Sequence, residues 1–155
     1  MKKSDIVLDV QAISLDHMAQ SKKRVLEQAA HLLSGSDDQT QIEQIFARLL
    51  ARERLGSTGL AAGVALPHAR LPGLTRSRAA FMRLHQAVDF DSQDGQPVDL
   101  VFVLLVPEEA TDDHLHLLAA LARLFRDAAV CHTLRTTHDV IQTQQVLTGS
   151  IEDAT

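Results

Sequence analysis

The stretch that decides the fold is VDLVFVLLV, residues 98–106. It is apolar with almost no alternation, and Pro107 ends it. A strand that is covered on both faces shows this pattern, so the run predicts a β-strand in the interior of an α/β sheet. Residues 79–84 (AAFMRL) predict a second strand that residues 88–90 can extend, and Asp94-Gly95 is a turn signal between the two strands.

Two segments before these strands have the apolar spacing of helices. The first begins after Ser21, a good N-cap residue, and Gly35 ends it. The second begins near Thr40, which has capping-box spacing to Glu43, and it ends at Gly56. Both helices therefore have recognisable start and stop signals.

Two further helices are predicted after the strands. Thr111 caps the first, which runs to about Asp127. The last runs over about residues 139–147 and ends at Gly149, and a polar tail follows. Because helices precede, separate and follow the strands, we expect an α/β fold: a single layered domain over residues 1–155, with a mixed, mostly parallel sheet flanked by helices.

Composition excludes several classes of function. The 155 residues carry a formal charge of −5, and the 3% of aromatic residues are all Phe. This balance provides no basic surface for phosphates and little base stacking, so we expect no nucleic-acid partner. The one cysteine, Cys131, excludes an intrachain disulfide and a multi-cysteine zinc site, and we expect it to be structural. No signal peptide is evident and no apolar run approaches the roughly 20 residues of a membrane span, so we expect a cytoplasmic protein without membrane insertion.

The first candidate for chemistry is His68, within GVALPHA (residues 63–69). A short apolar strand leads to Pro67, which stiffens the chain immediately before the imidazole. The small residues around it leave room for a partner or a phosphoryl group, and a neutral imidazole there can attack phosphorus. A turn histidine without chemistry has the same spacing, so the motif alone leaves both interpretations open.

The second candidate is His114, within TDDHLH (residues 111–116) at a predicted helix start. Free N–H groups at a helix N-terminus attract anions, and Asp112 and Asp113 suit the same positive end of the dipole. His114 could donate to a phosphoryl oxygen there. A metal site formed with His116 is disfavoured, because residues i and i+2 of a helix do not face the same way. A solvated helix start without chemistry is the remaining alternative.

The third candidate is RERLGSTG, residues 52–59. An arginine fork such as that of Arg52 binds phosphate through two donors, and Thr58 offers a hydroxyl and a backbone N–H between two glycines. The segment lacks the P-loop pattern, so nucleotide binding is not indicated. The alternative is a surface pair, Arg52 and Arg54, that compensates the helix dipole.

Together these stretches resemble the fructose/mannitol-type enzyme IIA domains of the bacterial phosphotransferase system, and most of all the nitrogen-regulatory IIA branch. ERLGSTGLAAGVALPHA (residues 53–69) resembles the active-site segment of that family. SKKRVL (21–26), DGQPVDLVFVLLVP (94–107) and HLHLLAALA (114–122) continue the resemblance in the family's order. It covers about residues 5–150, which implies one IIA-type domain with that core.

The resemblance implies that His68 is the histidine phosphorylated by an HPr-like phosphocarrier. It implies that His114 is the second histidine, which hydrogen-bonds the phosphoryl group, and that Arg52 lies near the same site. It implies no metal and no cofactor. The family's usual glycine and asparagine before Gly63 are replaced by alanines here, and the first of them, Ala61, lacks glycine's freedom at positive φ. The resemblance gives no role to four other histidines: His85, His116, His132 and His138.

Three functions follow from the resemblance. The first is a regulatory phosphocarrier in nitrogen or ion homeostasis, whose targets would be proteins such as transporters or sensor kinases. The second is a sugar-specific IIA component that passes phosphate to a IIB domain. The third is a binding module that is not phosphorylated. The GSTG segment and the short chain favour the first, and the intact histidines and Arg52 disfavour the third.

Overall fold

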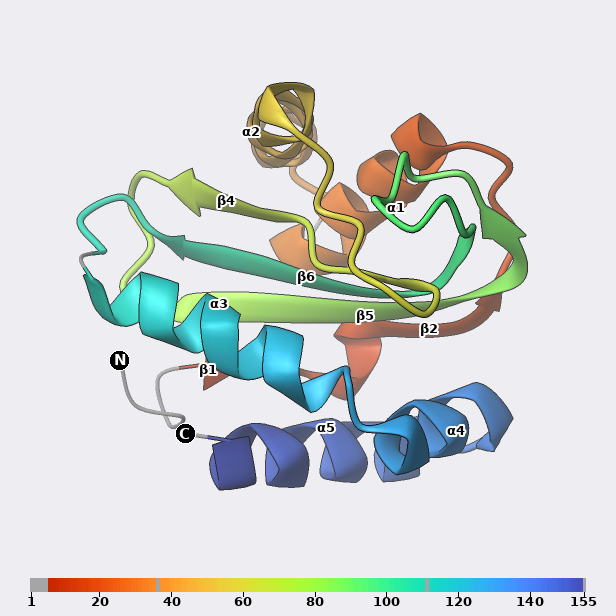
Figure 1. The fold of residues 1–155 in the computed structure, drawn as a ribbon. Helices are drawn as coiled ribbons and strands as arrows, with labels where there is room; N and C mark the ends of the chain where they lie inside the picture. The colour runs from red at the N-terminus through yellow and green to blue at the C-terminus, as the bar shows by residue number, and fades with distance from the viewer. Residues whose placement is uncertain (1–5, 36, 111, 155) are drawn as a thin grey trace.

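The computed structural model describes residues 6–35, 37–110 and 112–154 (Figure 1). In chain order the elements are β1 (Ile6–Val7), the 3-10 helix η2 (Val10–Ala12), β2 (Ile13–His17), α1 (Lys22–Ser34), α2 (Gln39–Leu55), β3 (Val64–Ala65), β4 (His68–Leu71), β5 (Ser77–Val88), β6 (Val98–Pro107), α3 (Asp112–Leu124), α4 (Ala128–Thr136) and α5 (Val140–Ala154). None of the helices in these ranges is long and apolar enough to cross a membrane.

The sheet is built on a central antiparallel pair, β5 and β6, in which Phe81 lies opposite Phe102. The turn at Asp94-Gly95 lies between these strands, as predicted, with Gly95 at φ 72°. Strands β1 and β2 both pair with β5 in parallel, and β3 and β4 both pair with β6 in parallel. Two interrupted edge strands therefore flank the central pair, and the predicted mixed sheet is confirmed.

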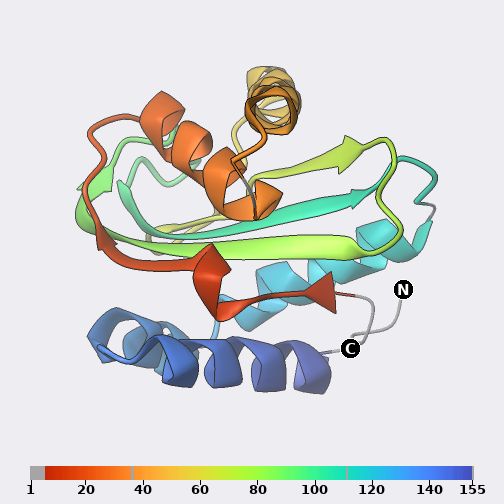
Figure 2. The ribbon, with the colours of Figure 1, turned by 180° about the vertical axis from the view of Figure 1, so that it is seen from behind.

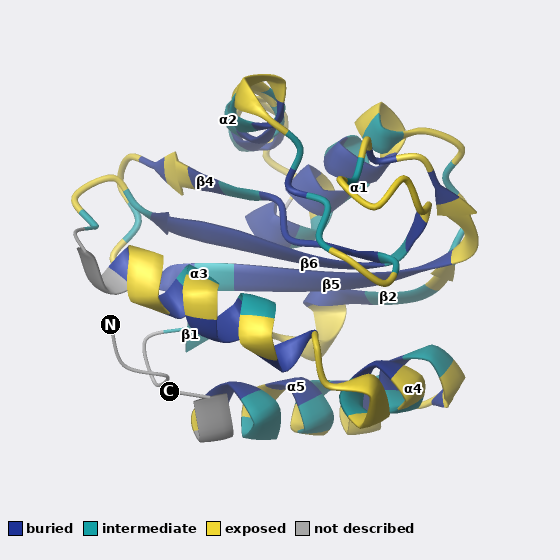
Figure 3. Ribbon diagram, viewed as in Figure 1, coloured by how far each residue is buried: buried dark blue, intermediate teal, exposed yellow. Residues whose placement is uncertain are grey.

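Helices cover both faces of the sheet. Helices α1 and α2 lie on one face, and α3, α4 and α5 lie on the other (Figures 1 and 2). Along β6 the side chains alternate between two cores: Val101 and Val103 pack under α1 and α2, while Phe102 and Leu104 pack on the other side. Figure 3 shows β6 buried along almost its whole length. This double cover explains why residues 98–106 are apolar without alternation.

The first two helices agree with their predicted positions. The Ser21 side chain accepts a hydrogen bond from the Arg24 N–H at 3.2 Å, and Gly35 ends α1 at φ 64°. The predicted capping box at Thr40 is wrong, because Asp38 caps α2 and accepts from the N–H groups of Thr40 and Gln41. The Asp38 carboxylate, two positions before Thr40, binds the free N–H groups of the first turn, so the helix starts at Gln39.

The C-terminal half differs more from the prediction. Helix α3 ends at Leu124, and a separate helix, α4, follows with Asp127 as its N-cap. The predicted stop at Gly149 and the polar tail are wrong, because α5 runs through Gly149 and Ile151 is buried in the core on that face. Burial of Ile151 outweighs the low helix propensity of a single glycine. Thr111, the predicted cap of α3, lies outside the described residues.

Candidate active site

His68 lies where the chain crosses from one short strand to the next. Val64 and Ala65 form β3, and the chain passes through Leu66 and Pro67 before His68 opens β4. The predicted strand therefore stops before the histidine, and a second strand begins with it. The backbone of His68 pairs with Leu104 of β6, which fixes the position of this residue on the sheet.

The His68 imidazole is held in one orientation by its own backbone. Its Nδ1 lies 2.9 Å from the Leu66 carbonyl oxygen. A carbonyl only accepts, so Nδ1 carries the proton and donates to it. In the neutral ring Nε2 is then left without a proton and has a free lone pair. The sequence motif did not indicate which nitrogen would be free, because the answer depends on this tertiary contact.

Burial makes the neutral form of His68 more stable. Desolvation lowers the pKa of His68 below its usual 6.5, and the positive charge of Arg52 lowers it too. The hydrogen bond to Leu66 and the negative charge of Glu53 raise it, but the lowering effects win. A neutral imidazole with a free nitrogen is a competent nucleophile at neutral pH.

A second imidazole faces the first. His114 lies in the first turn of α3 and is buried, and its ring centroid is 5.9 Å from that of His68, with the ring planes 58° apart. Burial lowers the pKa of His114, and the charges of His68 and Arg70 lower it further. Its Nδ1 is buried and has no hydrogen-bond partner within the described residues. The sequence placed these two residues 46 positions apart; the fold brings them together.

The two histidines of TDDHLH do not lie on the same face of α3. His114 is buried, whereas His116, two residues later on the same helix, is exposed. The two rings therefore do not converge on one ion. Among the described residues no group of three His, Cys, Asp or Glu side chains is arranged to hold a metal, and the side chains of Asp112 and Asp113 are not among those described.

Arg52 lies in the last turn of α2 and Thr58 in the loop that follows it, and their side chains differ in how free they are. One guanidinium N–H of Arg52 donates to the Gly56 carbonyl at 3.0 Å, which holds the side chain at the end of α2. Both donors of Thr58 are directed at Glu53: its N–H lies 2.9 Å from Oε1 and its hydroxyl 2.6 Å from Oε2. Binding of phosphate by Arg52 and Thr58 stays a prediction, and for Thr58 it would require a change of partner.

Glu53 is the site residue whose role sequence reasoning missed. Its side chain is only 3% exposed, and besides Thr58 it contacts the Lys22 ammonium at 2.8 Å. Lys22 also donates to the Phe90 carbonyl at 3.3 Å. Glu53 thus ties α2 to α1 and to the loop before His68. A carboxylate in the last turn of a helix opposes the dipole, and that unfavourable position was a signal that it has another partner.

Of the two alanines that replace the glycine and asparagine expected before Gly63, Ala62 is the one in a strained backbone conformation. Ala62 has φ 62°, whereas Ala61 is not among the residues with positive φ, so strain expected at Ala61 falls one residue later. The Ala62 N–H donates to Asp94 at 3.1 Å, and its carbonyl accepts from Arg135 at 2.7 Å. These two bonds hold the alanine in a conformation that costs an L-residue free energy.

Gly63 cannot be replaced in the same way. It has φ +80°, and a Cβ at this position would lie 2.8 Å from Nη2 of Arg135 and 3.0 Å from Oδ1 of Asp99. Those two side chains form an ion pair at 2.8 Å. The glycine therefore lets the chain approach this pair and turn into β3.

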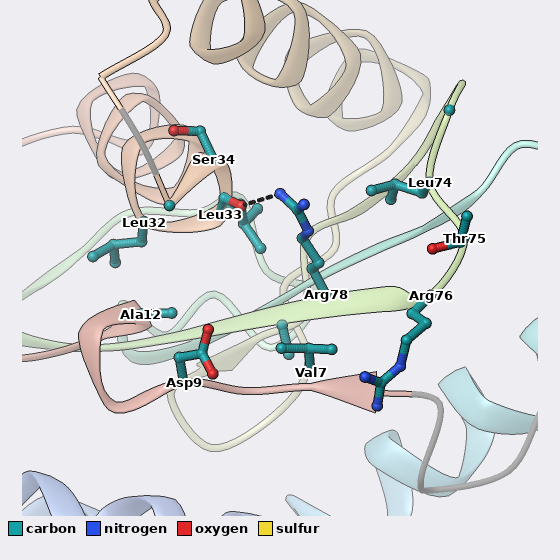
Figure 4. A pocket seen from close by; sticks show the side chains of 13 residues that line it. Val7, Asp9, Ala12, Leu32, Leu33, Ser34, Leu74, Thr75, Arg76 and Arg78 are labelled. Atoms are coloured by element: carbon teal, nitrogen blue, oxygen red, sulfur yellow. Dashed lines mark hydrogen bonds between the residues drawn. The ribbon is translucent and has the colours of Figure 1, made fainter.

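Two hollows in the surface lie apart from the histidine pair. One, with a volume of about 390 Å³, lies between α1, β1 and the start of β5. Figure 4 shows Arg78 reaching from β5 to the end of α1, where it donates to the Leu33 carbonyl at 3.2 Å. This arginine satisfies a helix C-terminus. A second hollow of about 790 Å³ lies between residues 57–62 and α3, and Leu60 and Phe125 line it. Neither hollow is lined by His68 or His114.

Residues 6–149 match the family described as "Phosphoenolpyruvate-dependent sugar phosphotransferase system, EIIA 2". The chain belongs to this EIIA type 2 family. The resemblance drawn from the sequence motifs is therefore confirmed, and so is its prediction of an EIIA type 2 fold.

Relatives narrow the likeness to one branch of the EIIA family. A nitrogen regulatory protein from Pseudomonas aeruginosa is 50% identical over 115 residues, which are 74% of this chain and 75% of that protein. The crystal structure of nitrogen regulatory protein IIA-Ntr from Neisseria meningitidis has a TM-score of 0.84 at 42% identity and covers 91% of this chain and 96% of that one. These relatives support an EIIA-type regulator.

A more distant structure shares the fold. The enzyme IIAMTL structure in complex with phosphorylated enzyme IIBMTL from Escherichia coli has a TM-score of 0.72 at 20% identity, and it covers 93% of this chain and 99% of that chain. In that complex an EIIA domain has a IIB domain as its partner.

Proposed function

We propose that this EIIA domain is a phosphocarrier that accepts a phosphoryl group on Nε2 of His68 from an HPr-like protein and acts as a regulator in nitrogen or ion homeostasis. The observation that carries the proposal is the Nδ1 contact of His68 with the Leu66 carbonyl at 2.9 Å, which leaves Nε2 as the free nucleophile. The His114 ring, 5.9 Å away, is the partner for the group that arrives there.

The transfer is a balanced exchange between two imidazoles. The lone pair of His68 Nε2 attacks phosphorus in line, the new N–P bond forms, and the N–P bond of the donor phosphohistidine breaks. The electron pair of the broken bond returns to the donor ring, while the proton stays on Nδ1 of His68 and continues to be donated to the Leu66 carbonyl. Because one N–P bond replaces another, the step is reversible and needs no metal or cofactor to activate the phosphoryl group.

The surroundings supply charge stabilisation for the equatorial oxygens. We assign this role to His114, to Arg52 and, after release from Glu53, to Thr58. A neutral His114 can donate one N–H to a phosphoryl oxygen, and the Arg52 charge acts on the same site because it already lowers the pKa of His68. Preorganised donors of this kind supply most of the catalysis in phosphoryl transfer.

Two exposed leucines beside the site suit a protein partner. Leu115, next to His114, is 62% exposed, and Leu55, at the end of α2, is 84% exposed. Apolar side chains of this size on the surface favour docking of a protein, because burial on contact removes their area from water. We assign them to the contact with the phosphocarrier.

The regulatory role is favoured because the relatives named above are nitrogen regulatory proteins. The second candidate, transfer to a IIB domain during sugar uptake, has support from the IIAMTL–IIBMTL complex, which shares the fold. The two differ in their acceptor. A IIB domain that takes up the phosphoryl group at a turnover rate would favour sugar transport, and binding to a transporter or sensor kinase that depends on the phosphorylation of His68 would favour regulation.

The proposal is tested by reconstitution with labelled phosphoenolpyruvate, enzyme I and the HPr-like carrier. We expect wild type to gain one acid-labile phosphoryl group and His68→Ala to gain none. His116→Ala is the matched control, since His116 is exposed on the same helix as His114, and it should label as wild type does. His114→Ala should accept the label but pass it on slowly. Undiminished labelling of His68→Ala would refute the assignment, and an unlabelled wild type would favour the binding module.

A further inference from the structure

A charged residue outside the predicted site connects the two histidines. Arg70 lies two residues after His68 on β4, and side chains two apart on a strand point to the same side of the sheet. The burial pattern along β4 agrees: His68 and Arg70 are the more accessible positions, and Ala69 and Leu71 are buried. Arg70 therefore emerges on the face on which His68 meets His114.

The Arg70 side chain contacts the backbone that leads into α3. Its Nη1 donates to the Glu108 carbonyl at 3.0 Å and to the Ala110 carbonyl at 2.5 Å. Figures 1 and 2 both show this stretch after β6 running beside the end of β4. Ala110 comes two residues before the first residue of α3, and His114 lies in the first turn of that helix. The position of His114 therefore depends on where Arg70 holds the chain.

The same stretch has a second tie. The Glu108 carboxylate lies 3.9 Å from a guanidinium nitrogen of Arg48 on α2. Glu108 is thus fastened through its carbonyl to β4 and through its side chain to α2. The ion pair with Arg48 is long and solvent-exposed, so the two shorter hydrogen bonds from Arg70 to backbone carbonyls are the stronger restraint.

Helix stability does not explain an arginine in this place. A cation beside the N-terminus of a helix opposes the dipole, which makes α3 less stable rather than more. The positive charge of Arg70 instead favours an anion bound nearby and the neutral form of His114. Arg70 lowers the pKa of His114, together with burial and the charge of His68.

We propose that Arg70 is a positioning residue for phosphoryl transfer: it holds the start of α3 against β4 so that the neutral His114 faces the phosphoryl group on His68. The consequence for transfer rests on the function proposed above. The effect on the free protein does not, because it concerns only the contacts of Arg70 with the backbone and its charge near His114.

The test uses three variants of the full chain. Arg70→Gln removes the charge and the fork, Arg70→Lys keeps the charge, and Arg123→Gln is a control with the same change in charge in the last turn of α3, far from His114. The imidazole of His114 is titrated by NMR in the unphosphorylated protein. We expect its pKa to rise in Arg70→Gln and to stay close to the wild-type value in Arg70→Lys and Arg123→Gln. Thermal unfolding checks that each variant is folded.

Transfer rates complete the test. We expect Arg70→Gln to slow onward transfer from phospho-His68 between about 10- and 100-fold, the loss that a displaced group typically causes, and Arg70→Lys to recover part of it. An unchanged titration of His114 in Arg70→Gln, or equal slowing by Arg123→Gln, overturns the inference. Absence of labelling on wild-type His68 would instead refute the proposed function and leave the titration result standing.

Discussion

Glu53 is where a single substitution should reveal how the loop before His68 is held. The change is Glu53→Gln, which keeps size and shape but removes the charge. In the folded protein the carboxylate, 3% exposed, accepts two hydrogen bonds from Thr58 and contacts the Lys22 ammonium at 2.8 Å. A glutamine side chain offers one acceptor oxygen and turns the other position into an NH₂ donor. If the amide oxygen takes the Oε1 position, the Thr58 N–H and the Lys22 ammonium keep an acceptor. The NH₂ group then faces only the Thr58 hydroxyl, which can turn to accept from it, so the main loss is the negative charge.

The magnitude follows from these three contacts. Hydrogen bonds to charged groups contribute about 1.5–3 kcal/mol each and those between neutral groups about 0.5–1.5 kcal/mol, so loss of the charge weakens all three contacts. Removing one partner of a buried ion pair costs about 3–5 kcal/mol. Because Lys22 is 20% exposed, the lower end applies, and we expect a loss of about 3 kcal/mol in the free energy of unfolding. For a domain of this size that is a fall of about 6–12 °C in Tm.

The assay is urea unfolding followed by circular dichroism, with Glu43→Gln as the control. Glu43 is exposed on the same helix, so the control carries the same change in charge and should shift stability by less than about 0.5 kcal/mol. A double-mutant cycle with Lys22→Met should show coupling, since removing both partners leaves no unpaired buried charge. A loss below about 1 kcal/mol in Glu53→Gln would refute the reasoning, because the contacts of Glu53 with Thr58 and Lys22 would then contribute no more than a surface ion pair.

Two further predictions concern the same site. Ala62→Gly should stabilise the protein by about 0.5–1 kcal/mol, because relief of the positive φ exceeds the added entropy of the unfolded chain. Ala61→Gly relieves no positive φ and should destabilise the protein by about 0.4–1 kcal/mol. The midpoints of urea unfolding measure both effects, and equal shifts in the two variants would contradict this explanation. The pH dependence follows from the lowered pKa values of His68 and His114. As the pH falls, the two histidines of the unfolded chain bind protons before those of the folded protein do. Their contribution to stability is therefore complete above the usual histidine pKa of 6.5 and is lost as the pH falls from there to the lowered pKa values of the folded state. Replacing both histidines with glutamine should flatten the stability profile below pH 6.5, and an unchanged profile would show that the two rings are not responsible.

The sequence predicted the elements whose signals are local. The apolar run at residues 98–106 gave the central strand, because cover on both faces removes alternation whatever covers it. Ser21 and Gly35 bound α1 as expected, since a cap acts within a few residues. The missed elements depended on distant partners: β1 is two residues long and exists through its pairing with β5, and the last turns of α5 are held by the burial of Ile151.

The candidate site divides in the same way. His68, His114 and Arg52 could be named from their motifs, because the motifs carry the residue types that phosphoryl transfer requires. The roles of Glu53 and Arg70 could not. Each depends on a contact with a segment distant in the chain, at Lys22 and at Ala110, and no local pattern identifies that partner.

The sequence by itself determined the class of this protein: the motifs in their order predicted the EIIA family that the comparisons confirm. Tertiary structure alone decided which nitrogen of His68 is free, since the Leu66 carbonyl accepts the hydrogen bond from Nδ1–H and leaves Nε2 without a proton. It also decided that the His114 ring lies 5.9 Å from the His68 ring, whereas His116 is exposed. The physical reason is that a residue type sets what chemistry is available, whereas protonation, tautomer and facing partner depend on burial and on contacts that the folded chain creates.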